Sequence, residues 1–340
     1  MRWIFLALLA ACGGRTGLGV GQHALADASP PSFDAGPDAI PIFDASDDVP
    51  APLGCANGLV KIADTGAQPD QLVLDGGFLY WHDQDGISRV HKTGGTVQGL
   101  TKTPAPGWPE LAAFALSSTD VYFAFGPQIG MVPKQGGPMT PIPLPIPNFP
   151  FVATSKTTLY AWSGGMPGPL FAAPLGGGGP GAPIATLPTP TSKIVVDGNR
   201  GYTATDGGVQ AVDLGTGTIT WLSGLGAADV AVDASDVYFT TIDMTNGAAV
   251  MRVPKTGGPQ STVVAENGAY AVALSATDLY FTERLDMLVK KVVGKTSSLV
   301  VIVASFDFTT QPIALALDDQ CVYVTVAPNG APGAIYGAPR

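Results

Sequence analysis

The stretch Val230–Gly258, VAVDASDVYFTTIDMTNGAAVMRVPKTGG, decides the fold of this chain. Its apolar runs, Val230–Val232, Val237–Thr240 and Val250–Val253, are separated by a polar turn and a loop, and it closes on a Lys-Thr-Gly-Gly turn. A fourth run, Ser261–Ala265, follows. Short runs rich in β-branched and aromatic residues, bounded by Gly, Asp and Asn, are typical of β-strands. The stretch therefore predicts four consecutive strands within about 40 residues.

The same unit recurs along the chain. Each predicted second strand carries a tyrosine, at spacings of 36 to 43 residues: Tyr80, Tyr122, Tyr160, Tyr202, Tyr238, Tyr280 and Tyr323. After most of them comes a third strand that ends in a glycine turn, as in Arg89–Gly95 (RVHKTGG), Met131–Gly137 (MVPKQGG) and Arg252–Gly258. Four-stranded units repeating at about 40 residues are typical of β-propeller blades. We therefore predict an all-β, seven-bladed β-propeller with four-stranded blades.

The ends of the array indicate how the ring closes. The seventh repeat supplies three strands, over Ile313–Leu317, Cys321–Val326 and Ala334–Ala338. An unpaired strand candidate, Gly58–Ala63, precedes the first complete repeat. An open ring would expose unpaired strand edges, which invite aggregation. We therefore predict that the amino-terminal strand pairs as the outer strand of the seventh blade.

Composition and motifs narrow the classes of function. Of the 340 residues 13% are charged, and the net charge is −10. No basic stripe is present to neutralise phosphates, which argues against nucleic-acid binding. The three histidines, His23, His82 and His91, are too few and too scattered for a histidine-rich metal site. The sequence contains no nucleophile elbow or phosphate-binding loop. We expect no metal, no cofactor and no catalytic residue set.

The amino terminus, Met1–Cys12 (MRWIFLALLAAC), has the features of an export signal. Arg2 supplies a positive charge, and the apolar run after it is too short to span a bilayer. The last four residues, LAAC, resemble the lipobox of bacterial lipoproteins. The resemblance implies cleavage before Cys12 and a diacylglycerol on its thiol; the alternative is an ordinary secretory signal. Gly13 stands where lipoproteins of the inner membrane often carry Asp, so we expect an outer-membrane lipoprotein of a bacterial cell envelope.

Residues 24–52 have a different composition, with six Asp, six Pro and no Lys or Arg. Such a segment buries too little apolar surface to offset the entropy of ordering it. An alternative use of Asp44, Asp47 and Asp48 as calcium ligands lacks the glycine and the terminal Glu of an EF-hand loop. We therefore divide the chain into a signal peptide (1–11), a disordered acidic tether (12–53) and the propeller (54–340).

The repeat pattern resembles the YWTD and related propellers, and more closely the propeller lipoproteins of bacterial cell surfaces. The resemblance covers roughly Gly54–Arg340, through the tyrosine strand and the PKxGG turn. It implies the fold and a surface location, and it leaves the function open, since such propellers bind proteins, peptides or sugars and a minority are enzymes.

One repeat carries a second resemblance. Ala211–Trp221, AVDLGTGTITW, is similar to the tryptophan-docking motif of quinoprotein propellers, with Thr218 in place of Lys. In that family the motif packs the tryptophan, here Trp221, against the neighbouring blade. The motif is structural and does not imply a quinone cofactor.

Binding residues are expected on the loops that join second to third strands and blade to blade. Acids there can be general acids, cation ligands or merely solvated charges; tryptophans can stack on a sugar or peptide, or can be buried between blades. The candidates are His82, Asp83, Asp85, Trp108, Trp162, Glu283 and Asp286.

From these observations we expect a monomeric binding or scaffold module for a protein or glycan, held to the membrane by its lipid. The alternatives are an envelope enzyme of the lyase or lactonase type and a purely structural surface protein. Acids and a histidine clustered in the central channel would favour the enzyme, whereas a broad aromatic or apolar patch at the rim would favour the binder.

The remaining cysteines form an even pair. Lipidation of Cys12 leaves Cys55 and Cys321, and exported proteins keep disulfides. Second and fourth strands run parallel, so ring closure brings both cysteines to the same end of the seventh blade. Two strand spacings, roughly 9–10 Å, exceed the usual Cα limit of about 7 Å, but the segment before the closing strand can bend back. We predict a Cys55–Cys321 disulfide; two free, buried thiols are the alternative.

Overall fold

A computed structural model describes residues 55–66, 69–101, 111–125, 128–146, 150–163, 167–176, 181–191, 193–242, 248–328 and 331–340. These residues belong to one compact unit, Val49–Arg340. Cys12, the tether predicted at 12–53 and Trp108 lie outside the described residues. No helix in the described part of the chain is long and apolar enough to cross a membrane.

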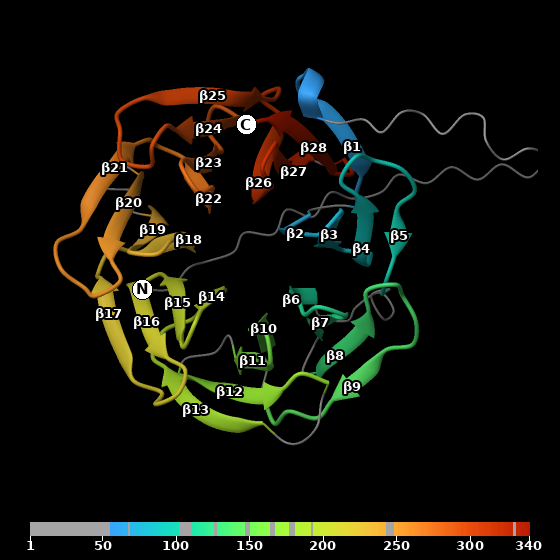
Figure 1. The fold of residues 1–340 in the computed structure, drawn as a ribbon, viewed down its shortest axis with the longest axis vertical. Coiled ribbons are helices and arrows are strands. Elements are labelled where there is room, and N and C mark those ends of the chain that lie inside the picture. Colours follow the sequence, from blue (N-terminus) through green and yellow to red (C-terminus); the bar gives the residue numbers. More distant parts are fainter. Residues whose placement is uncertain are drawn as a thin grey trace, which may run out of the picture. The chain divides into compact units, whose positions relative to one another are not determined.

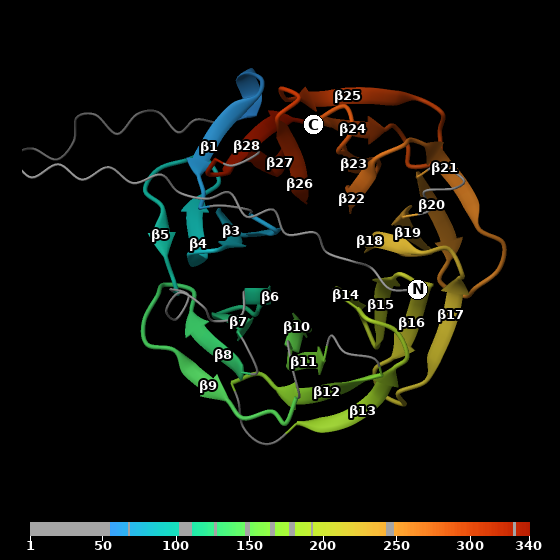
Figure 2. The ribbon, with the colours of Figure 1, turned by 180° about the vertical axis from the view of Figure 1, so that it is seen from behind.

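Seven four-stranded antiparallel sheets are arranged around a central axis, as the two views in Figures 1 and 2 show. This confirms the predicted seven-bladed β-propeller. In blades 1 to 6 the four strands follow one another in sequence from the innermost to the outermost.

Blades 1 to 3 comprise, from the centre outward, β2 (Gln71–Asp75), β3 (Phe78–Asp83), β4 (Gly86–His91) and β5 (Gln98–Gly99); β6 (Leu111–Leu116), β7 (Asp120–Phe125), β8 (Gln128–Pro133) and β9 (Thr140–Ile142); and β10 (Pro150–Thr154), β11 (Thr158–Ser163), β12 (Gly168–Pro174) and β13 (Ala182–Leu187).

Blades 4 to 6 comprise β14 (Ile194–Asp197), β15 (Arg200–Thr205), β16 (Gly208–Asp213) and β17 (Ile219–Ser223); β18 (Ala227–Val232), β19 (Asp236–Thr241), β20 (Ala249–Pro254) and β21 (Ser261–Ala265); and β22 (Ala269–Leu274), β23 (Leu279–Glu283), β24 (Leu288–Val292) and β25 (Val300–Ser305).

Blade 7 joins the two ends of the ring. It consists of β26 (Thr310–Leu317), β27 (Cys321–Pro328), β28 (Ala334–Pro339) and, as its outermost strand, β1 (Val60–Asp64). β1 pairs antiparallel with β28, from Val60 opposite Gly337 to Asp64 opposite Ala334; Figure 1 shows this as a blue strand beside a red one. The predicted closure by the amino-terminal strand is confirmed.

The second strand of most blades is a nearly continuous apolar run, and its position inside the blade explains why. Each blade packs between two others, so both faces of this strand are buried; every residue of β23, LYFTE, is buried. The seven repeat tyrosines all lie in the core. Two of their hydroxyls reach the next blade: the Tyr122 Oη accepts a hydrogen bond from the Gly176 amide (2.8 Å), and the Tyr280 Oη accepts one from Arg340 Nε (3.3 Å).

We call the end of the ring with the turns between first and second strands, and between third and fourth strands, the turn end. The other end, with the second-to-third loops and the blade-to-blade connections, is the loop end. At the turn end, four junctions between blades carry an Asp at the start of one blade's first turn and a Lys on the next blade. These pairs are Asp75–Lys134, Asp197–Lys255, Asp233–Lys295 and Asp318–Lys92.

The other three junctions lack this ion pair and have a different residue at each position. Ser117, Ser155 and Ser275 replace the Asp, and Leu175, Leu214 and the carboxyl-terminal Arg340 replace the Lys of the following blade. The backbone amides of Lys134, Leu175 and Arg340 all bond to the first turn of their own blade, which shows that their positions are equivalent. The residue types at the two positions therefore change together around the ring.

The disulfide is also at the turn end. Cys55 and Cys321 are bonded, with their Cα atoms 6.0 Å apart, so the prediction is confirmed. The short 3₁₀ turn η1 (Cys55–Asn57) bends the lead-in back, which brings Cys55 within range of a partner two strands away. The bridge crosses β28 over Gly337, where a Cβ would lie 3.5 Å from the Cys55 Cβ.

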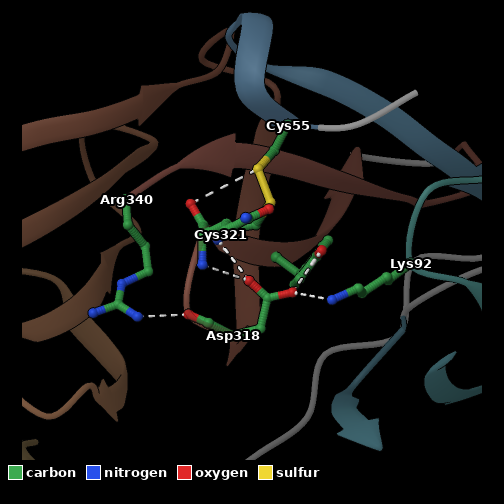
Figure 3. Close-up of a disulfide and its surroundings, with 7 residues drawn as sticks. Cys55, Lys92, Asp318, Cys321 and Arg340 are labelled. Atoms are coloured by element: carbon green, nitrogen blue, oxygen red, sulfur yellow. Dashed lines mark hydrogen bonds and ion pairs between the residues drawn. A yellow bond between two sulfur atoms is a disulfide. The ribbon is translucent and has the colours of Figure 1, made fainter. Parts of the chain in front are cut away.

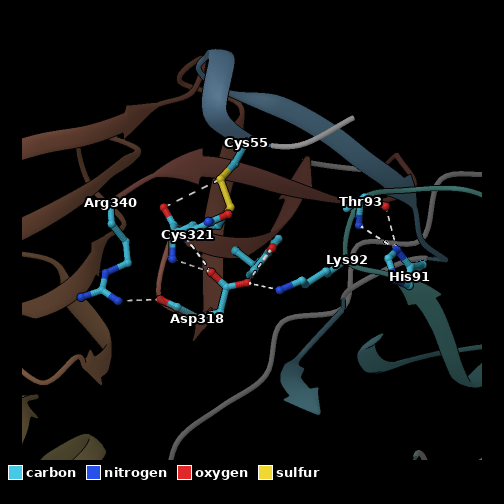
Figure 4. A network of polar contacts seen from close by, with 9 residues as sticks. Cys55, His91, Lys92, Thr93, Asp318, Cys321 and Arg340 are labelled. Atoms are coloured by element: carbon cyan, nitrogen blue, oxygen red, sulfur yellow. Dashed lines mark hydrogen bonds and ion pairs between the residues drawn. A yellow bond between two sulfur atoms is a disulfide. The ribbon is translucent and has the colours of Figure 1, made fainter. Parts of the chain in front are cut away.

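A polar cluster surrounds the bridge, as Figure 3 shows. The Asp318 carboxylate accepts hydrogen bonds from the Cys321 amide (2.7 Å) and from Lys92 Nζ (2.8 Å), while the Asp318 carbonyl accepts one from Arg340 (2.6 Å). Figure 4 adds the neighbouring turn, where exposed His91 contacts the Thr93 hydroxyl at 2.7 Å. The disulfide therefore ties β27 to the segment before β1 within blade 7, while the Lys92–Asp318 ion pair joins blade 7 to blade 1 and the Arg340–Tyr280 hydrogen bond joins it to blade 6.

Candidate functional site

A cavity of about 610 Å³ lies at the centre of the ring. The innermost strands of all seven blades line it. Its polar side chains, which include Asp70, Lys193, Asp229 and Tyr270, come mostly from the points where inner strands begin, and these face the loop end. Apolar residues such as Leu116 and Leu315 line it further along the strands.

Bulges shape the wall of this cavity. The inner strands of blades 5, 6 and 7 slip register against their neighbours at Ala227/Asp229, Ala269/Val272 and Pro312/Leu315. In each case a threonine hydroxyl on the second strand, Thr240, Thr282 or Thr325, accepts a hydrogen bond from an amide in the bulge (2.9–3.1 Å). A bulge leaves extra residues unpaired and re-aims their side chains.

Tyr270 is one of these re-aimed residues, and it lines the cavity while 39% exposed. The Arg284 guanidinium lies over its ring at 4.3 Å from the centroid. Arg284 is itself held by the Gln311 side-chain oxygen at 2.6 Å. The Tyr270 carbonyl accepts a hydrogen bond from the Thr240 hydroxyl (2.6 Å). Contacts from three blades therefore fix the position of this aromatic ring.

An ion pair crosses from blade 4 to blade 5 in the same cavity. Lys193 Nζ lies 2.6 Å from an oxygen of Asp229. The Asp229 carboxylate also accepts hydrogen bonds from the amides of Val230 (2.8 Å) and Val272 (2.9 Å), so both of its oxygens are used. The Lys193 side chain is about half exposed, and its ammonium has three N–H donors.

His82 stands two residues after its repeat tyrosine, the position that Thr240, Thr282 and Thr325 occupy in blades 5 to 7. It lines the cavity, is only 4% exposed and lies near the Phe114 ring. Burial lowers the pKa of His82 to about 4, so the ring is neutral at pH 7. Its Nδ1 is buried without a hydrogen-bond partner among the described residues.

The predicted acids do not converge on one site. Asp83 and Glu283 close the second strands of blades 1 and 6, and each accepts hydrogen bonds from amides of the loop that follows it. The Asp83 carboxylate accepts hydrogen bonds from Trp81 Nε1 (3.0 Å) and from the amides of Gly66 (2.8 Å) and Asp85 (2.9 Å).

Glu283 accepts hydrogen bonds from the amides of Leu285 (2.7 Å) and Asp286 (3.0 Å), and burial raises its pKa. Asp85 and Asp286 are exposed on these loops. Among the described residues, no group of three or more His, Cys, Asp or Glu side chains is placed to hold a metal ion.

The tryptophans lie in places that sequence reasoning did not decide. Trp162 is buried, donates to the Thr191 carbonyl (2.7 Å) and stacks on Phe151, so it is a core residue and offers no surface to a ligand. Trp221 is 47% exposed. In the docking-like motif, Gly217 approaches the neighbouring blade closely, and a Cβ there would clash with the Ile184 carbonyl.

Exposed apolar side chains occur on the loops and on the bulge at the loop end of three consecutive blades, 5 to 7. Ile242 follows the second strand of blade 5, Leu285 lies in the corresponding loop of blade 6, and Phe308 connects blades 6 and 7. With Tyr270 they are 42%, 68%, 86% and 39% exposed, respectively. We call Ile242, Leu285 and Phe308 the loop-end patch; Tyr270 belongs to the central cavity. Sequence reasoning missed them, although an apolar residue inside a turn, as in ERLDM or FDFTT, was a usable signal.

Comparison with known proteins identifies the fold. No family model and no curated protein matches the chain. Among solved structures, a catalytically inactive virginiamycin B lyase from Staphylococcus aureus with quinupristin matches 82% of this chain and 98% of its own, at 15% identity and TM-score 0.66. The WD40 domain of Neurospora crassa Pan2 matches 83% and 96%, at 12% identity and TM-score 0.62. At such identities the likeness shows the propeller fold alone.

Proposed function

We propose that this protein is a binding module of a bacterial envelope, anchored by a lipid on Cys12, which captures a protein or glycan with the loop end of its propeller. The loop-end patch is the observation that carries the proposal. Large apolar side chains exposed on the loops of three consecutive blades, all at the same end of the ring, favour an interaction surface. We also place the chain among surface lipoproteins with YWTD-related propellers, on the strength of the tyrosine strand and the PKxGG turn.

Two observations support export and anchoring. The Cys55–Cys321 disulfide suits an oxidising compartment. Its formation leaves Cys12 as the remaining cysteine of the chain, in a lipobox-like sequence behind an apolar signal. The acidic, proline-rich tether would then hold a monomeric propeller away from the outer membrane and leave its loop end free to meet a partner.

Anchoring is tested by Cys12→Ser in the full chain. A diacyl anchor supplies the two acyl chains that stable membrane attachment requires, so the variant should leave the membrane fraction or remain unprocessed. Detergent-phase partitioning measures this directly. Equal partitioning of the variant and the wild type would contradict lipidation.

Partner binding is tested by capture of envelope components on the full chain, compared with a Leu285→Ser/Phe308→Ser variant. A matched control carries Met139→Ser and Leu299→Ser, two exposed apolar residues outside the loop end. We expect the same partner on the wild type and the control, and its loss from the loop-end variant. Equal capture by all three would exclude the loop-end patch.

One observation favours the alternative of a lyase-type or lactonase-type enzyme, namely a histidine in the central cavity. A catalytic histidine needs a hydrogen-bonded partner that orients it or a nucleophile that it activates. The His82 Nδ1 has no such partner in the described part of the chain. The site therefore supports binding better than catalysis.

A further inference from the structure

The central cavity contains polar side chains whose hydrogen-bonding capacity is unused. His82 is 4% exposed, lines the cavity and has an unpartnered Nδ1. An orphaned buried nitrogen is rare in folded proteins and calls for an explanation such as a bound ligand. The Tyr270 hydroxyl also has no hydrogen-bond partner among the described residues, and Lys193 uses one of its three donors.

The Tyr270 ring is held in advance of any ligand. Arg284 covers one face, Gln311 holds Arg284, and the bulge of β22 directs the ring toward the cavity. Because these contacts have already removed the rotational freedom of the side chain, a ligand that packs on it loses little further entropy. An aromatic ring with a free hydroxyl offers both an apolar surface and a hydrogen bond.

The charges in the cavity select against ions. Asp229 is neutralised by Lys193 and by two backbone amides, so neither charge of the pair is left uncompensated. An anion would approach Asp229 and Asp70, and a cation would approach Lys193. A neutral group that both donates and accepts hydrogen bonds suits Lys193, neutral His82 and the Tyr270 hydroxyl together, and a hydroxyl is such a group.

We propose that this cavity binds a neutral sugar of one or two rings, which packs on Tyr270 and hydrogen-bonds to His82 and Lys193. The volume of about 610 Å³ lies within the range of small-molecule sites, about 300–1,000 Å³. The proposal rests on the binding role argued above. It adds a second site, inside the ring, that is separate from the surface formed by Leu285 and Phe308.

The repeats themselves provide substitutions that the fold accepts. His82→Thr introduces the residue found at the same position in blades 5 to 7, and Tyr270→Ala introduces the residue found in blade 5, where Ala228 occupies the bulge. Both variants should melt cooperatively, as followed by circular dichroism. Leu285→Ser/Phe308→Ser serves as the matched control, because it changes the loop end and leaves the cavity side chains intact.

The experiment uses the full chain in a detergent without a sugar headgroup. The probes are glucose, galactose, mannose, N-acetylglucosamine, cellobiose, lactose and chitobiose, with glucuronate and glucosamine as charged comparators. Binding is followed by saturation-transfer NMR and titration calorimetry. We expect at least one neutral probe to bind, about tenfold more weakly to Tyr270→Ala, and with a dissociation constant that changes less than about twofold between low and high salt.

The proposal is overturned if no neutral probe binds the folded wild type, if Tyr270→Ala and His82→Thr bind as well as the wild type, or if a charged comparator binds best. Sugar binding by the Leu285→Ser/Phe308→Ser control, together with loss of the envelope partner, would show two separate sites. Sugar binding combined with equal partner capture by every variant would uphold this inference while contradicting the proposed partner surface.

Discussion

The turn end and the loop end of the same ring use their side chains differently. At the turn end, charged groups reach across blade junctions: Lys92 pairs with Asp318, and Lys295 with Asp233, while a disulfide closes the seam. At the loop end, Glu283 caps its own loop, Phe308 is 86% exposed, and the His82 Nδ1 has no hydrogen-bond partner among the described residues. Because stabilising contacts are concentrated at the turn end, the loop end can carry exposed or unpartnered side chains that are available for binding.

The difference has a physical origin in the connections. Turn-end connections are short and repeat a similar polar turn in most blades, so equivalent positions meet at each junction, and at four junctions they form an ion pair. Loop-end connections vary in length and in bulge position, so each blade presents a different side chain to the centre. Stability and binding should therefore respond separately to substitutions at the two ends.

The largest effect is expected from loss of the disulfide. Cys55→Ala/Cys321→Ala opens a covalent link between residues 266 positions apart. The chain-entropy model gives an upper bound of about 6 kcal/mol for such a loop. Urea unfolding should show a loss of several kcal/mol in the variant, and a similar loss in the reduced wild type. If both cysteines of the unfolded, unreduced wild type react with maleimide, the bond is absent.

A smaller and asymmetric effect is expected at the Asp75–Lys134 junction. Lys134 is 5% exposed, whereas the Asp75 side chain is about half exposed. Asp75→Ser leaves a buried ammonium without its carboxylate and should cost about 2 kcal/mol. Lys134→Leu leaves a hydrated carboxylate and should cost less than about 1 kcal/mol.

The double variant at this junction should recover most of the loss, because Ser followed by Leu is the combination found at the Ser117–Leu175 and Ser155–Leu214 junctions. Urea unfolding of the two single variants and the double variant provides the coupling energy. Additive losses would mean that the covariation around the ring has no energetic basis.

Acid should weaken the turn end through Asp233. Burial opposes ionisation of its carboxyl, but hydrogen bonds from the Asp236 amide and from Lys295 outweigh it and lower its pKa to about 2. Because the folded pKa lies below the ordinary value near 3.8, the stabilisation is complete above about pH 4 and is lost as the pH falls toward 2. Asp233→Asn should lose about 1–2 kcal/mol at pH 7.

Thermal melts at pH 7, 4, 3 and 2 measure this prediction. The difference in stability between wild type and Asp233→Asn should shrink as the pH falls. A difference that stays constant across the series would show that the Asp233 charge does not contribute.

The smallest effect on stability is expected at the loop end. Leu285→Ser/Phe308→Ser removes two largely exposed side chains and should change the unfolding free energy by less than about 0.5 kcal/mol. The melting temperature should match that of the wild type even where partner capture is lost. A marked loss of stability would indicate that these residues pack in the folded protein and would remove the contrast between the two ends.

The sequence determined a large part of the architecture. A tyrosine about every 40 residues, paired with a glycine turn about ten residues later, encodes strands locally, so the blade number could be counted without coordinates. The closing strand and the Cys55–Cys321 bond followed from the missing outer strand of the last repeat. Boundaries moved slightly, from the predicted Gly58–Ala63 to the observed Val60–Asp64, because strand ends depend on pairing with β28.

Only the tertiary structure decided which side chains meet. The sequence shows Asp75 and Lys134 as separate turn residues, and their pairing requires two blades to be packed side by side. It shows Trp162 and Trp221 as equivalent aromatic candidates, whereas packing buries the first and exposes the second. Tyr270 stands within an ordinary apolar run, and a register shift against β23 directs it into the channel. Strand patterns are local and can therefore be recognised in the sequence. Which side chains meet at the ring centre depends on bulges and on contacts between residues far apart in the chain.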